Sequence, residues 1–140
     1  MSVIVPNEGL QWLLTRMLKQ PNPLTDPFRL RLFQNNYTPV HGSVLADFTQ
    51  CTAAGYTSKN LAPSGWIDAL PSGDAAMSYW AAGILTFTAS AGSQNTFGYY
   101  VTDPDGNFCL WAERWPVAPQ PLAPATPVQV LPSLRMLSLF

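Results

Sequence analysis

Residues 96–115 have the sequence TFGYYVTDPDGNFCLWAERW. Two runs rich in aromatic and β-branched residues, 96–102 and 107–114, lie on either side of the turn sequence DPDG. Pro104 suits the second position of a type I turn, and Gly106 can adopt the left-handed conformation that completes a bulged hairpin. This stretch therefore predicts an antiparallel β-hairpin.

Both faces of the predicted hairpin carry large apolar side chains. On the second strand, Phe108, Leu110 and Ala112 alternate with Cys109, Trp111, Glu113 and Trp115. Because neither face is mainly polar, we expect the hairpin to be covered on one side by the core and on the other by a further element or a partner.

Other short strands are expected on the N-terminal side of the hairpin. Phe28, Leu30 and Leu32 alternate with two arginines, which is typical of a half-buried strand. Further strands are expected at 56–61, 77–80 and 84–89, and residues 62–76 are expected to form a long loop. Short strands separated by turn signals predict an all-β fold, an antiparallel β-sandwich of jelly-roll type.

One amphipathic helix is expected at residues 7–19. Asn7 is a suitable N-cap, and Glu8 is favoured in the first turn by the helix dipole. The apolar positions recur at helical spacing, at Leu10, Leu13, Leu14, Met17 and Leu18. Pro21 and Pro23 then close the helix, whose expected role is to cover one end of the core.

The C-terminal region, residues 116–140, is expected to be an extended arm. Prolines at 116, 119, 121, 124, 127 and 132 exclude a helix or a central strand. A polyproline II conformation would let residues 116–132 span roughly 50 Å. An apolar end follows, so we expect the arm to reach a neighbouring subunit. The alternatives are an arm that folds back on its own domain and a partly disordered tail.

The chain is thus divided into an N-terminal extension (1–6), a helix-plus-sandwich domain (7–115) and the C-terminal arm (116–140). The apolar residues of the extension can add a strand to a sheet edge or anchor the chain in a partner. The residues predicted to form interfaces are Val3, Ile4, Val5, Trp111, Trp115, Leu134, Met136, Leu137, Leu139 and Phe140.

The composition favours a chain that functions inside an assembly. Only 11% of the 140 residues are charged and 47% are apolar, whereas ordinary soluble domains are about one quarter charged. Low surface charge gives a free monomer poor colloidal stability. The seven basic residues are scattered and the net charge is −1, so we expect no nucleic acid partner. No signal peptide and no membrane-spanning stretch are expected, hence no membrane partner.

The sequence predicts no enzyme activity, no metal site and no cofactor. His41 is the only histidine, whereas triads and metal sites need further groups beside it. Asp103 and Asp105 are explained by turn formation. Cys51 and Cys109 match no zinc or redox spacing; we expect two buried free thiols, with one disulfide as the alternative.

The aromatic residues admit two interpretations. Rings can stack on the faces of a sugar, or they can belong to the core and to interfaces, which we favour. The candidates are Trp66, Tyr79, Trp80, Tyr99, Tyr100, Trp111 and Trp115.

Several segments together resemble a known group of proteins. They are LRLFQNNYTP at 30–39, LADFT at 45–49, GY at 55–56, TFT at 86–88, FGYYVT at 97–102 and LWAER at 110–114. The chain from about residue 7 to 115 resembles small virion proteins of tailed bacteriophages, including some that infect cyanobacteria. Some members of this group resemble capsid decoration, or cement, proteins. These motifs are strand and turn patterns and carry no active site.

The resemblance implies a β-sandwich that binds the outer face of an assembled capsid, often as a trimer. The implied partners are the major capsid protein and other copies of the chain, on virions assembled in the bacterial cytoplasm. The alternative is a tail-fibre, baseplate or adhesin module that binds host carbohydrate.

Overall fold

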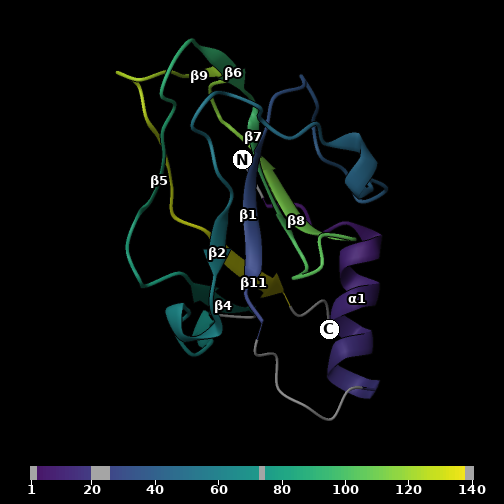
Figure 1. Ribbon diagram of the computed structural model, residues 1–140. Coiled ribbons are helices and arrows are strands. Elements are labelled where there is room, and N and C mark those ends of the chain that lie inside the picture. The colour runs from purple at the N-terminus through teal and green to yellow at the C-terminus, as the bar shows by residue number, and fades with distance from the viewer. Residues whose placement is uncertain (1–2, 20–25, 73–74, 138–140) are drawn as a thin grey trace.

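The computed structural model describes residues 3–19, 26–72 and 75–137, and it is mostly β with one α-helix (Figure 1). It also contains two single-turn 3-10 helices, Leu45–Asp47 and Pro63–Gly65. All pairings between its strands are antiparallel, which confirms the predicted all-β class. The elements are α1 (Asn7–Lys19), β1 (Phe28–Phe33), β2 (Lys59–Leu61), β3 (Leu70–Ser72), β4 (Ala75–Tyr79), β5 (Leu85–Phe87), β6 (Gln94–Thr96), β7 (Gly98–Thr102), β8 (Cys109–Arg114), β9 (Gln120–Leu122), β10 (Val128–Val130) and β11 (Ser133–Leu137).

The predicted hairpin is confirmed as β7 and β8, which belong to a four-stranded sheet in the order β2-β1-β7-β8. At the turn, the Gly106 N–H donates to the Asp103 carbonyl (3.0 Å), and Gly106 has a φ of +74°. A bulge lies between Val101 and Thr102. The buried Asp103 carboxylate accepts the N–H groups of Asn107 and Phe108, so this acidic residue stabilises the turn.

The helix begins and ends where the sequence predicts, and it lies against β8 (Figure 1). A Cβ atom at Gly9 would overlap the backbone carbonyls of β8, so only glycine allows this close approach. Leu13 is half-buried, as expected for the apolar face, but Leu10 is exposed. The side chains of Leu14, Met17 and Leu18 lie outside the described part.

Glu8 joins three parts of the chain. Its Oε1 accepts the N–H of Cys109 at the start of β8 (2.7 Å) and the N–H of Leu45 at the start of a short 3-10 helix (2.9 Å). These bonds satisfy two backbone donors that would otherwise lack a partner, because α1 covers this end of β8.

The N-terminal residues belong to the same folded unit as the domain. Ile4 forms an antiparallel bridge with Ala112 of β8, through two hydrogen bonds of 2.9 Å. Val3 and Val5 pack against the core. Of the two predicted roles, strand addition to a sheet edge is therefore correct, and the edge belongs to the chain's own sheet.

The described residues up to 137 fold back on their own domain, so this alternative is correct for them and the prediction of an extended arm that reaches a neighbouring subunit is wrong. β9 pairs with β6, β10 with β5, and β11 with β4, and Figure 1 shows the yellow C-terminal chain alongside β5. Leu122, Val128 and Val130 are at most 4% exposed and belong to the main core. A domain boundary after Trp115 would divide this core. The exclusion of a central strand is confirmed, since each of the three strands lies at a sheet edge.

A buried hydrogen-bond relay fixes the start of this segment. The Trp115 indole N–H donates to the Thr96 hydroxyl (3.2 Å), and that hydroxyl donates to the Gln120 carbonyl (2.8 Å). Thr96 is fully buried. Because a buried hydroxyl is costly when unpaired, the relay favours one position of the segment against β6.

Apolar residues cover both faces of the four-stranded sheet, as the hairpin pattern predicts. The main cluster on one face includes Leu30, Val101 and Trp111, together with Phe87 and Val128 from β5 and β10. The smaller cluster on the other face includes Phe33, Phe48, Tyr100, Cys109 and Ala112. What covers the hairpin on both sides is therefore the chain itself.

Some strand boundaries differ from the prediction. The expected strand at 96–102 is divided at Phe97, so that its first residue lies in β6 and the rest in β7, in two different sheets. The expected loop at 62–76 contains the short strand β3. Trp66 in this segment bridges Trp80.

Replacing Leu122 by alanine should lower the free energy of unfolding by about 2–5 kcal/mol, because it removes a fully buried side chain. The control is Leu131→Ala in the same segment; Leu131 is 57% exposed, and its loss should change stability by less than about 0.5 kcal/mol. Urea denaturation measures both. Equal effects of the two substitutions would contradict the described position of the segment.

Glu8→Ala should lower the free energy of unfolding by at least about 2 kcal/mol, since two N–H groups lose a charged acceptor. Glu8→Gln retains an oxygen acceptor and should lose less than half as much. Thermal and urea unfolding of the two variants measure the difference. Similar losses for both variants would mean that the two hydrogen bonds do not stabilise the fold.

Candidate interaction surface

The structure places most of the predicted interface residues within the protein. Trp111 and Trp115 are 1% and 9% exposed and lie in the main core, which corrects their assignment to an interface. Leu134 is half-buried and packs against the same core. The backbones of Met136 and Leu137 pair with β4, and Leu139 and Phe140 lie outside the described residues.

Several exposed large apolar residues lie on or next to β3, β4, β5 and the chain 128–137, namely Leu70, Tyr79, Ile84 and Leu131. Along that chain, Val128, Val130 and Pro132 are buried, whereas Gln129, Leu131 and Arg135 are exposed. The strand alternation therefore directs one set of side chains to the core and the other to solvent.

The pairing register brings apolar residues from the neighbouring strands onto the same outer side. Leu70 of β3 lies opposite Met77 of β4, and Tyr79, two residues further, lies opposite Ser133. Ile84 directly precedes β5 and Leu131 directly follows β10, so the two flank the terminal pair Leu85–Val130. We call this set the outer stripe: Leu70 (50% exposed), Met77 (half-buried), Tyr79 (38%), Ile84 (60%) and Leu131 (57%).

The outer stripe has the chemistry of a protein-binding surface. Large apolar and aromatic side chains that remain exposed next to each other mark contact sites more often than single exposed residues do. Arg135 lies opposite Met77 and is exposed, so it adds one positive charge beside the stripe. Figure 1 shows that β4 and β11 lie at the end of the molecule away from β6 and β9.

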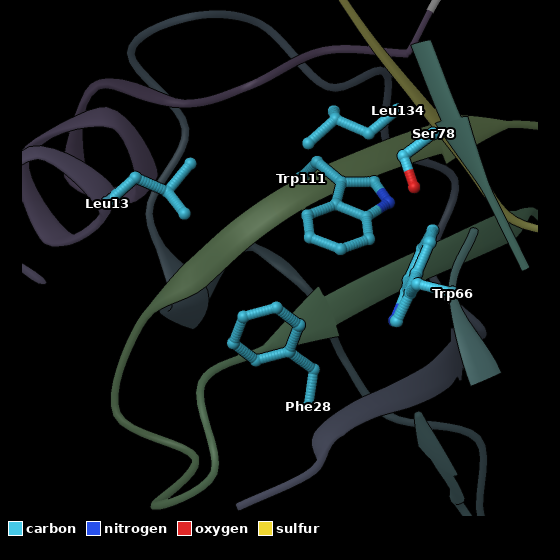
Figure 2. Close-up of a pocket in the computed structure, with 6 residues that line it drawn as sticks. All are labelled: Leu13, Phe28, Trp66, Ser78, Trp111 and Leu134. Atoms are coloured by element: carbon cyan, nitrogen blue, oxygen red, sulfur yellow. The ribbon is translucent and has the colours of Figure 1, made fainter. Parts of the chain in front are cut away.

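A small apolar cavity lies on the inner side of the same strands (Figure 2). Its volume is about 170 Å³, and its lining residues are Leu13, Phe28, Trp66, Ser78, Trp111 and Leu134. The Trp111 ring makes edge-to-face contacts with Phe28 and Trp66, each with 5.9 Å between ring centroids. The Ser78 hydroxyl donates to the Ile67 carbonyl (2.8 Å). The cavity is thus a space between α1 and the sheets with little polar chemistry.

A second hollow lies beside α1. Its volume is about 280 Å³, and it is lined by Glu8, Gln11, Trp12, Thr15 and Phe108. It differs from the first in containing a carboxylate and two polar side chains as well as aromatic rings.

Most of the aromatic candidates for sugar binding are inaccessible. Trp80, Tyr99, Tyr100, Trp111 and Trp115 are buried. Trp66 is half-buried and Tyr79 is exposed. The Tyr99 hydroxyl donates to the Glu113 carboxylate (3.0 Å). Burial is the larger cause that raises the pKa of Tyr99, and the charge of Glu113 is the next. The preference for core over sugar face is confirmed for the five buried rings.

Cys51 and Cys109 are free and buried, as the sequence predicts. Burial, and then the charges of Glu8 and Asp47, raises the pKa of the Cys109 thiol. Burial also raises the pKa of Cys51, and it raises the pKa of Tyr100 to about 12. Because the thiolate is the reactive form, these thiols are inert near neutral pH.

The remaining candidate groups occupy structural positions. His41 is exposed, with its Nδ1 3.3 Å from the Val5 carbonyl. Within the described residues, His, Cys, Asp and Glu side chains form no group that can hold a metal ion. The helix in that part of the chain is too short to cross a membrane.

In comparisons with known proteins, no family model, no curated protein and no solved structure matches this chain.

The raised pKa of Cys109 predicts a loss of stability at alkaline pH. Because the folded-state pKa of the Cys109 thiol lies above the unfolded value of 9.0, its contribution to stability is complete below pH 9 and is lost as the pH rises. At about pH 10 the loss from Cys109 should be about 1.4 kcal/mol. Urea titrations at neutral and alkaline pH should show a smaller loss for Cys109→Ala than for the unmodified chain. Identical losses would contradict this assignment.

Proposed function

We propose that the protein is a non-enzymatic structural component of a tailed-phage virion, a capsid decoration protein that binds the assembled shell. The observation that carries this proposal is the outer stripe, a row of exposed apolar side chains on a chain with only 11% charged residues. The resemblance of segments between residues 7 and 115 to small virion proteins agrees with this function.

The outer stripe replaces the terminal arms as the attachment surface in this proposal. Residues 3–5 and 120–137 pair within their own chain, so they are not available to bridge subunits. The proposed partners are the major capsid protein and further copies of the chain in a trimer. The proposed architecture is a jelly-roll-like sandwich formed by the sheets together. Repetition over a symmetric shell converts modest single contacts into strong attachment.

The test is binding of the purified protein to undecorated capsids of the phage that encodes it, measured by co-sedimentation. Ile84→Ser combined with Leu131→Ser should weaken binding about tenfold or more, since each buried large side chain contributes about 1.5–3 kcal/mol. Val117→Ser is the matched control, because Val117 is 77% exposed but lies outside the stripe. Both variants should keep the unfolding midpoint of the unmodified protein.

Two outcomes would contradict the proposal. One is unchanged capsid binding by the folded Ile84→Ser, Leu131→Ser variant. The other is antibody labelling of virions at the tail with none over the shell.

A further inference from the structure

The hollow beside α1 combines a negative charge with two aromatic rings. Glu8, Gln11, Trp12 and Thr15 belong to α1, and Phe108 directly precedes β8. Phe108 is 41% exposed, so a partner can reach it. We call this hollow the α1 groove.

Among the described residues, no cation pairs with the Glu8 carboxylate. Its Oε1 accepts two backbone N–H groups, and no ion pair involves Glu8 within residues 3–19, 26–72 and 75–137. Arg16 lies eight residues further along α1, about 12 Å along the helix axis, and it is not among the described residues that line the groove. A half-buried carboxylate favours a positive group beside it.

The aromatic rings of the groove favour arginine over lysine as the bound cation. Trp12 packs edge-to-face against Phe28 (5.7 Å between centroids), which fixes one side of its ring system. Cations bind favourably over the faces of such rings. The planar guanidinium of arginine can stack on an aromatic ring while it donates to a carboxylate, whereas a lysine ammonium acts as a compact, strongly hydrated charge.

We propose that the α1 groove binds an arginine side chain of a partner protein, with the guanidinium held between the Glu8 carboxylate and the rings of Trp12 and Phe108. Gln11 and Thr15 supply polar groups at the groove wall. Arginine with aromatic residues is the combination enriched at the energetic centres of protein interfaces.

The experiment titrates the full chain with N-acetyl-arginine amide at constant ionic strength. The indole N–H signal of Trp12 in a ¹H–¹⁵N correlation spectrum, assigned with Trp12→Phe, is the readout. We expect a saturable shift with a dissociation constant on the order of 10 mM. N-acetyl-citrulline amide has the same shape without the charge and should bind at least about fivefold more weakly. Equal responses to the two probes would overturn the proposal.

Variants assign the binding to the groove. Glu8→Gln keeps the oxygen that accepts the two N–H groups but removes the charge, and it should weaken arginine binding about fivefold or more. Phe108→Leu should weaken binding through loss of the ring and provides a second test at an exposed position, independent of the Glu8 contacts. Leu10→Ala is the control on α1 outside the groove and should bind as the unmodified chain does.

Unchanged binding by Glu8→Gln or by Phe108→Leu would overturn the proposal. Equal affinity for N-acetyl-lysine amide would overturn the assignment to arginine. Failure of these titrations leaves the capsid proposal intact, because that proposal depends on the outer stripe and is tested with different variants.

Discussion

Three strands of this protein depend on its C-terminal segment for their pairing. β5 pairs with β10 and β6 pairs with β9, each in a two-stranded sheet, and β4 takes β11 as one of its two neighbours. Leu122, Val128 and Val130 of the same segment lie in the main core. The fold is therefore completed only when residues 120–137 pair with β4, β5 and β6, and the Trp115–Thr96–Gln120 relay fixes where this pairing begins.

The prolines of this segment restrict how it can pair and do not prevent pairing. Pro121 lies opposite Asn95 and has no N–H to donate, so β9 can complete a sheet but cannot lie in its centre. The strands β9, β10 and β11 lie at sheet edges. Alternation along residues 128–137 then produces two surfaces from one chain: a buried row that joins the core and an exposed row that contributes Leu131 to the outer stripe.

Because the described residues near both termini pair within the chain, we expect the interface on side chains of the sheet surface and not at the termini. Ile4 pairs with Ala112, and β11 pairs with β4, so the apolar residues at these described positions are used inside the chain. The outer stripe and the α1 groove both face outward. The first offers apolar area and the second offers a negative charge with aromatic rings, so the two surfaces suit different contacts.

The features that follow from local sequence are predicted well. The helix at 7–19 depends on spacing within one segment, and the hairpin depends on a turn of four residues, in which Gly106 has the expected left-handed φ. The C-terminal pairing depends on residues 24–62 positions away, from Thr96 opposite Gln120 to Ala75 opposite Leu137, and proline content alone does not reveal such partners. Trp111 and Trp115 illustrate the same limit: the sequence predicts that they are covered, but only the fold identifies the cover as the chain itself. The outer stripe depends on register, because a shift of one residue would exchange Val130 with Leu131.

Residue-resolved hydrogen exchange of the intact protein tests most directly whether the C-terminal segment completes its own domain. The hydrogen-bonded amide protons in residues 120–137 should exchange with an opening free energy close to that of β7 and β8, because all belong to one cooperative core. Exchange of these amides at the rate of an unstructured peptide, while β7 and β8 remain protected, would show a free arm and contradict this account.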